Sequence, residues 1–192
     1  MTAAPNAITP QRYSQGLTYD AYLAQMTGDR ERYQKSAAEF KLASEDAKFF
    51  RDAVKRLGVK ALAIVEDWCP DVHRGLPVMA GIAQAAGMEL RVFYRDQNPD
   101  VMALYLKEGK YQSIPVFAFL DKDLKPLCHF IERPSPATRF ISEMAAELTK
   151  KKLSEEELRL ERRKRMSPLT EDWRQETVRE MRELLGNVAP AR

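Results

Sequence analysis

The sequence contains little cysteine and little histidine. Its 192 residues include two cysteines, Cys69 and Cys128, and two histidines, His73 and His129. Two cysteines are too few for a disulfide framework in a chain of this size. The four residues also lack the spacing of metal ligands, so we predict neither a metal site nor a bound cofactor.

Long apolar runs and a dominant charge are also missing. No stretch approaches the roughly 18 apolar residues of a membrane span. The N-terminal residues MTAAPNAITPQRYSQG do not have the charged start and apolar run of a signal peptide. The formal net charge is +3, which does not indicate nucleic-acid binding. We therefore expect a cytoplasmic protein with reduced thiols that binds neither membranes nor nucleic acid.

The hydrophobic pattern predicts alternating helices and strands through the middle of the chain. Residues 1–17 look irregular, and a polar helical segment runs from Thr18 to about Ala43. Ser44 is a predicted N-cap with acids in the first turn, and Gly58 ends that helix. The pattern then predicts strands over 59–68, 88–95, 114–120 and 126–132, and helices over 70–86, 99–107 and 136–151.

This order predicts an α/β fold with a mixed sheet. A βαβ unit followed by a ββα hairpin gives four strands with helices on both faces. We divide the chain into an N-terminal helical lead-in (1–43), the α/β domain (44–150) and a C-terminal helical extension (151–192).

The C-terminal extension has its own start and break signals. Ser154 and Glu157 form a capping box, Pro168 interrupts the helix, and a second helix starts at Thr170. The apolar residues are regularly spaced, so we expect the two helices to pack on the core or on a second copy, as in a homodimer. The basic cluster 162–165 shares its helix with acids and is interpreted as a solvated face.

The strongest local feature is Trp68-Cys69-Pro70-Asp71, where a buried strand ends and a helix begins. Backbone N–H groups and the helix dipole favour a thiolate at this position. We therefore expect Cys69 to be partly exposed, with a pKa below the ~8.5 of a free cysteine unless the nearby acids Glu66 and Asp67 cancel this effect. His73 lies one turn later and could accept the thiol proton or stabilise the thiolate, although an exposed helix histidine is the simpler interpretation.

These residues together resemble the thioredoxin superfamily. The resemblance rests on Trp68-Cys69 at a strand end, Pro77 inside the next helix, and Ile114-Pro115 before a later strand. It covers about residues 45–150 and is closest to a poorly characterised bacterial branch. It implies a thioredoxin-like fold, a cis bond before Pro115, and a substrate site formed by Trp68, Pro70, Ile114 and Pro115.

The resemblance also shows what this chain lacks. The Cys-x-x-Cys site of the family reads Cys69-Pro70-Asp71-Val72 here, so no second thiol can resolve a mixed disulfide. Ala63 stands where thioredoxins often carry a buried acid. Cys128 is expected two strands away, beyond the reach of a disulfide to Cys69.

Two functions follow from this site. In the first, Cys69 performs monothiol exchange on a protein or small thiol or disulfide substrate, with an external thiol as resolving partner. In the second, the fold is redox-inactive and binds an extended peptide or partner beside Pro115 through backbone hydrogen bonds.

Overall fold

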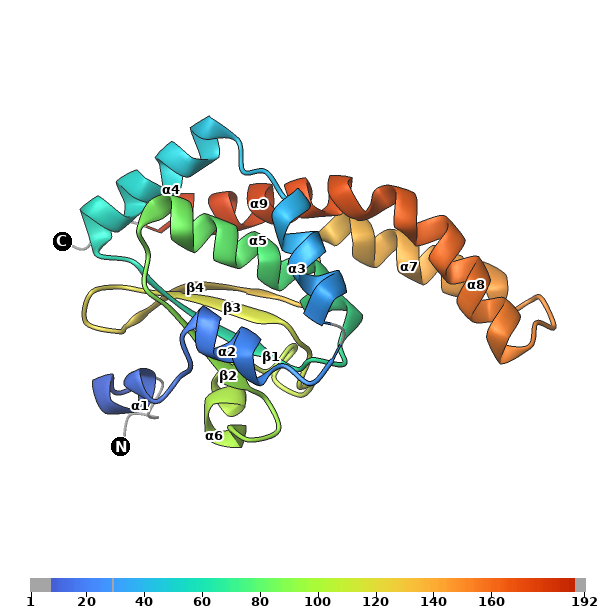
Figure 1. The fold of residues 1–192 in the computed structure, drawn as a ribbon, viewed down its shortest axis with the longest axis horizontal. Coiled ribbons are helices and arrows are strands. Elements are labelled where there is room, and N and C mark those ends of the chain that lie inside the picture. Colours follow the sequence, from blue (N-terminus) through green and yellow to red (C-terminus); the bar gives the residue numbers. More distant parts are fainter. Residues whose placement is uncertain (1–7, 29, 189–192) are drawn as a thin grey trace.

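A four-stranded mixed sheet forms the centre of the protein (Figure 1). The computed structural model describes residues 8–28 and 30–188. The strands are β1 (Lys60–Val65), β2 (Leu90–Tyr94), β3 (Val116–Leu120) and β4 (Pro126–Ile131), arranged in the order β2-β1-β3-β4. β1 runs parallel to β2, while β3 is antiparallel to both β1 and β4. The mixed sheet predicted from the sequence is therefore confirmed.

Helices cover both faces of this sheet. Figure 1 shows α4 (Ser44–Leu57), α5 (Pro70–Ala86) and α9 (Thr170–Gly186) above it, and α6 (Pro99–Met102) below it. On the upper face, Phe119 of β3 stacks on Phe50 of α4 with ring centroids 6.4 Å apart. On the lower face, Tyr105 in the 3-10 turn after α6 packs on His129 of β4. Because both faces are covered, β1 and β3 are almost entirely buried, as their apolar sequences predict.

Local signals set the ends of the two long helices that flank β1. Gly58 and Gly87 follow α4 and α5 in the left-handed conformation, with φ of 62° and 66°. Pro70 begins α5, where a missing N–H costs no hydrogen bond. The prediction of Ser44 as an N-cap is wrong, because α4 begins at Ser44 and Ala43 is the cap.

The N-terminal segment is more broken than its sequence indicates. The described part of the irregular lead-in contains a short helix, α1 (Pro10–Ser14), and residues 1–7 lie outside the described residues. The helical segment expected over 18–43 is present as two helices, α2 (Tyr19–Gln25) and α3 (Arg30–Glu39). Between them, the backbone N–H of Thr27 donates to the Asp67 carboxylate over 2.9 Å. This contact ties the segment between α2 and α3 to the residues that follow β1, so α2 does not continue into α3.

The C-terminal extension divides into a docked and an undocked helix. After α7 (Ser135–Leu148), the predicted capping box of Ser154 and Glu157 opens α8 (Glu155–Met166), which buries none of its residues. A 3-10 turn (Ser167–Leu169) leads into α9. Figure 1 shows the end of α7 and all of α8 extending beyond the sheet, whereas α9 returns along the body. Four apolar residues of α9 are buried there: Trp173, Val178, Met181 and Leu185.

None of the described helices is both long and apolar enough to cross a membrane.

Candidate functional site

Cys69 lies at the junction predicted from the sequence, between the end of β1 and the start of α5. It is the N-cap residue of α5, and its Sγ donates a hydrogen bond to the Ile114 carbonyl over 3.6 Å. The Ile114-Pro115 bond is cis, which confirms that prediction. Gly75 allows α5 to pack closely on β3 beside this turn, because a Cβ there would lie 3.1 Å from the Phe117 ring and 3.4 Å from the Pro115 ring. Cys69, Pro70, Ile114 and Pro115 are therefore close together.

The predicted exposure and acidity of Cys69 are wrong. The residue is 7% exposed. Burial raises the pKa of the Cys69 thiol above its usual value, and this effect outweighs the backbone N–H groups of Val72 and Asp71, which lower it. The Asp71 carboxylate raises this pKa further, and Arg74 opposes it. Because a thiolate could not donate to the Ile114 carbonyl, the observed hydrogen bond belongs to the neutral thiol.

The position of a resolving thiol is occupied by a core residue. Val72 is fully buried in the first turns of α5. Cys128 lies on β4, with β3 between it and β1, and both cysteines are free. Burial raises the pKa of Cys128 to about 12. The expected placement of Cys128 two strands from β1, which Cys69 follows, is therefore confirmed.

His73 is held by neighbours other than the thiol. Its Nε2 lies 2.5 Å from the Asp67 carbonyl, and its ring meets the Tyr33 ring edge-on at 5.9 Å. A carbonyl only accepts, so Nε2 carries the proton. Within the described residues, no hydrogen bond joins this ring to Cys69. The role of His73 in thiol chemistry stays a prediction.

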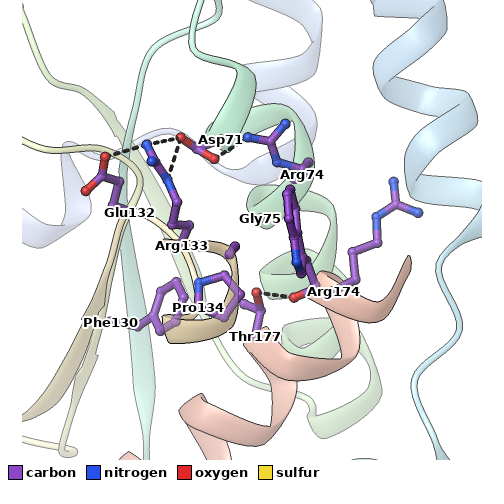
Figure 2. Close-up of a pocket in the computed structure, with 11 residues that line it drawn as sticks. Asp71, Arg74, Gly75, Phe130, Glu132, Arg133, Pro134, Arg174 and Thr177 are labelled. Carbon is purple, nitrogen blue, oxygen red and sulfur yellow. Dashed lines mark hydrogen bonds and ion pairs between the residues drawn. The ribbon is translucent and has the colours of Figure 1, made fainter. Parts of the chain in front are cut away.

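A chain of ion pairs fastens the start of α5 to the end of β4 (Figure 2). Asp71, which is buried, accepts from Arg133 at 2.6 and 3.1 Å and also from Arg74. Arg133 contacts Glu132 as well, and Lys107 reaches Glu132 over 2.5 Å. The Glu132 N–H donates to the Pro115 carbonyl over 2.7 Å. The network thus links the start of α5, which follows Cys69, to the Ile114-Pro115 turn.

Figure 2 also shows the small hollow beside this network, between α5, the end of β4 and α9. Its walls are largely occupied by groups that already have partners. Arg74 lies 5.8 Å over the Trp173 ring, and the Thr177 hydroxyl donates to the Trp173 carbonyl. We interpret the hollow as a packing feature of the ion-pair network.

Aromatic side chains are exposed on the solvent side of the site. Trp68 is 62% exposed, and the Arg95 guanidinium lies 5.1 Å from its ring centroid. Arg95 also donates to the Gln112 carbonyl over 3.4 Å, which brings Trp68 next to the segment that begins with Tyr111. Tyr111 is 49% exposed. We call the surface formed by Trp68, Arg95 and residues 111–114 the aromatic edge.

The aromatic edge includes backbone that is not engaged within the protein. Among residues 8–28 and 30–188, no hydrogen bond occupies the N–H groups of Ser113 and Ile114 or the Ser113 carbonyl. Such groups can pair with an added strand. The expected substrate residues Trp68, Ile114 and Pro115 belong to this edge or adjoin it.

Sequence reasoning missed three parts of the site. Arg133 is 62 residues from Asp71, and only the fold brings them together. Arg95 and Tyr111 carry no motif, and the exposure of the Tyr111 side chain cannot be read from its neighbours. The one available signal was Asp71 itself, an acid in the first turn of a buried helix that requires a cationic partner.

Comparison with known proteins agrees with this geometry. A family model described as Thioredoxin matches residues 16–152. A crystal structure of a protein of unknown function from Pseudomonas aeruginosa superimposes with a TM-score of 0.68 at 17% identity, covering 95% of this chain and 99% of that one. A crystal structure of an HIV epitope-scaffold superimposes with a TM-score of 0.67 at 14% identity, covering 95% of this chain and 100% of that one. None of the curated proteins matches the chain. At these identities the two structures show the fold alone.

Proposed function

We propose, from the premise that this chain belongs to the thioredoxin family, that it binds an extended peptide segment of a protein partner at the aromatic edge. The observation that carries the proposal is the opposite orientation of two groups. The Cys69 thiol is turned inward onto the Ile114 carbonyl, while Trp68 is 62% exposed. The N–H groups of Ser113 and Ile114 and the Ser113 carbonyl have no hydrogen-bond partner in the described residues. These orientations favour recognition of a partner over thiol exchange.

The binding mode follows from the groups that are free. In an extended strand the N–H and carbonyl of one residue point to the same side, so the free N–H and carbonyl of Ser113 pair with an extended chain in the manner of an added strand. Trp68 and Tyr111 then cover apolar side chains of that segment. Exposed aromatic rings suit such contacts because they offer a large apolar area with few rotatable bonds. We also propose a cytoplasmic location, since both cysteines are free.

The test is a peptide selection on the full-length protein from a random displayed library. Selected peptides should bind with micromolar dissociation constants, and Trp68→Ala should weaken their binding about tenfold or more, the loss of an aromatic anchor. Leu184→Ala, which truncates an exposed side chain on α9, is the matched control and should leave affinity unchanged. In NMR spectra, the amides of Ser113 and Ile114 should shift on binding. Peptides that bind Trp68→Ala as well as the wild type would contradict the proposal.

Monothiol exchange through Cys69 is the second candidate, favoured by one observation. The backbone N–H groups of Asp71 and Val72 approach Sγ at the start of α5 and lower its pKa, although less than burial raises it. In that reaction the Cys69 thiolate attacks a substrate disulfide, one substrate thiolate leaves, and an external thiol then cleaves the mixed disulfide. Cys69→Ser separates the two functions, because it abolishes exchange and leaves peptide binding at the aromatic edge intact.

A further inference from the structure

Helix α8 presents a face that the rest of the protein does not cover. At about 100° per residue, the half-buried residues Leu158, Glu161 and Arg165 fall on one side of the helix. Arg165 pairs with Glu147 of α7 at 2.6 Å and with Glu161 at 2.7 Å, so this side lies against α7. The opposite side carries Leu160, which is 54% exposed. We call this opposite side, formed by Glu156, Glu157, Leu160, Arg163 and Lys164, the outer face of α8.

Charge on the outer face is divided symmetrically about Leu160. Glu156 and Glu157 lie four and three residues before it, and Arg163 and Lys164 lie three and four residues after it. Within residues 8–28 and 30–188, neither Glu156 nor Arg163 forms an ion pair. The face is therefore acidic, then apolar, then basic along one helix.

This order of charges is complementary to itself when reversed. In an antiparallel pair related by a two-fold axis through Leu160, Glu156 of one helix lies beside Arg163 of the other, and Glu157 lies beside Lys164. The two-fold axis repeats both contacts, which gives four opposite-charge pairs around a Leu160–Leu160 centre. A parallel pair would instead place acid against acid and base against base.

We propose that the outer face of α8 binds the same face of a second copy of this chain, forming an antiparallel two-fold dimer. The position of α8 permits it, because Figure 1 shows the helix projecting beyond the sheet, away from α1, α2 and the strands. The proposed interface does not include the aromatic edge, so dimer formation is independent of peptide binding. A helix of this length spans about 18 Å, so the interface is small, and exposed ion pairs weaken with salt. We therefore expect a weak dimer whose dissociation constant rises with ionic strength.

Charge reversal on the full-length protein tests the proposal by sedimentation velocity from about 10 to 500 µM, a range that spans weak association. Glu156→Arg alone and Arg163→Glu alone should each raise the dissociation constant about tenfold or more, because like charges then face each other. An equimolar mixture of the two variants should recover the dimer, since each arginine again faces a glutamate. The double variant carrying both changes should recover it as well.

The matched controls are Glu155→Arg and Arg162→Glu. These residues are exposed, occupy the same turns of α8 and face away from Leu160, so the changes disturb the helix dipole equally and should leave the dissociation constant unchanged. Three results would overturn the proposal: a monomeric wild-type protein at the highest concentration in low salt, control variants that weaken association as much as the test variants, or a mixture that fails to recover. Circular dichroism verifies that each variant keeps its helix content.

Discussion

Met181→Ala is expected to lower the free energy of unfolding by about 2–5 kcal/mol, the range for truncating a large side chain in a packed core. Met181 is fully buried between α9 and the body, where Val178 and Leu185 are also buried. The same helix is fastened to α4 by Arg182, which reaches Asp46 over 2.7 Å. If α9 is an integral part of the core, truncating Met181 leaves a cavity between this helix and the body. Chemical denaturation of the full-length protein measures the change.

Leu184→Ala is the control on the same helix. Its side chain is 36% exposed, and truncation at such a surface position changes stability by about 0.5 kcal/mol or less. Equal small effects of the two substitutions would mean that α9 does not dock on the core. A large effect of Met181→Ala alone confirms that the C-terminal helix belongs to the folded unit.

Asp71→Ala is expected to destabilise the protein by about 2–3 kcal/mol. Removing one member of a buried ion pair costs about 3–5 kcal/mol, and the cost is smaller here because Arg74 and Arg133 each keep about a fifth of their side-chain surface in water. The substitution leaves two neighbouring guanidinium groups without their shared carboxylate. It also removes a negative charge that raises the pKa of Cys69, so that pKa should fall.

Asp100→Ala provides the comparison for Asp71→Ala. Asp100 also receives two hydrogen bonds from one arginine, Arg12, at 2.7 and 2.8 Å, but its side chain is largely exposed. A surface pair of this kind contributes about 0–1 kcal/mol. Denaturation midpoints of the two variants therefore measure the effect of burial on otherwise similar contacts. Equal losses would contradict the structural role assigned to the Asp71 network.

Much of the fold could be predicted because its signals are local. The continuous apolar run of β1, the glycines after α4 and α5, and the capping box of α8 each act within a few residues of where they stand. The break between α2 and α3 could not be predicted in this way. It depends on Asp67, 40 residues further along the chain, which accepts the Thr27 N–H.

The sequence predicted where the site lies in the fold, but it did not predict the burial and the raised pKa of the Cys69 thiol. Trp68, Cys69 and the Ile114-Pro115 turn were placed correctly, because a strand end, a helix start and a proline mark them in the sequence. The exposure of Cys69 was predicted wrongly because its surroundings are not local. The Ile114 carbonyl is 45 residues away, and burial by distant segments overcomes the helix N–H groups that suggested an acidic thiol.

The most direct test of this account is the pH dependence of Cys69 alkylation by iodoacetamide, measured in the Cys128→Ser variant. Alkylation follows the thiolate, so its rate rises as pH passes through the pKa of the thiol. Since burial raises that pKa, we predict slow reaction at pH 7 and a midpoint above the ~8.5 of free cysteine. A midpoint below ~8.5 with fast reaction at pH 7 would contradict the account, because Cys69 would then be a reactive thiolate and monothiol exchange the better description of this site.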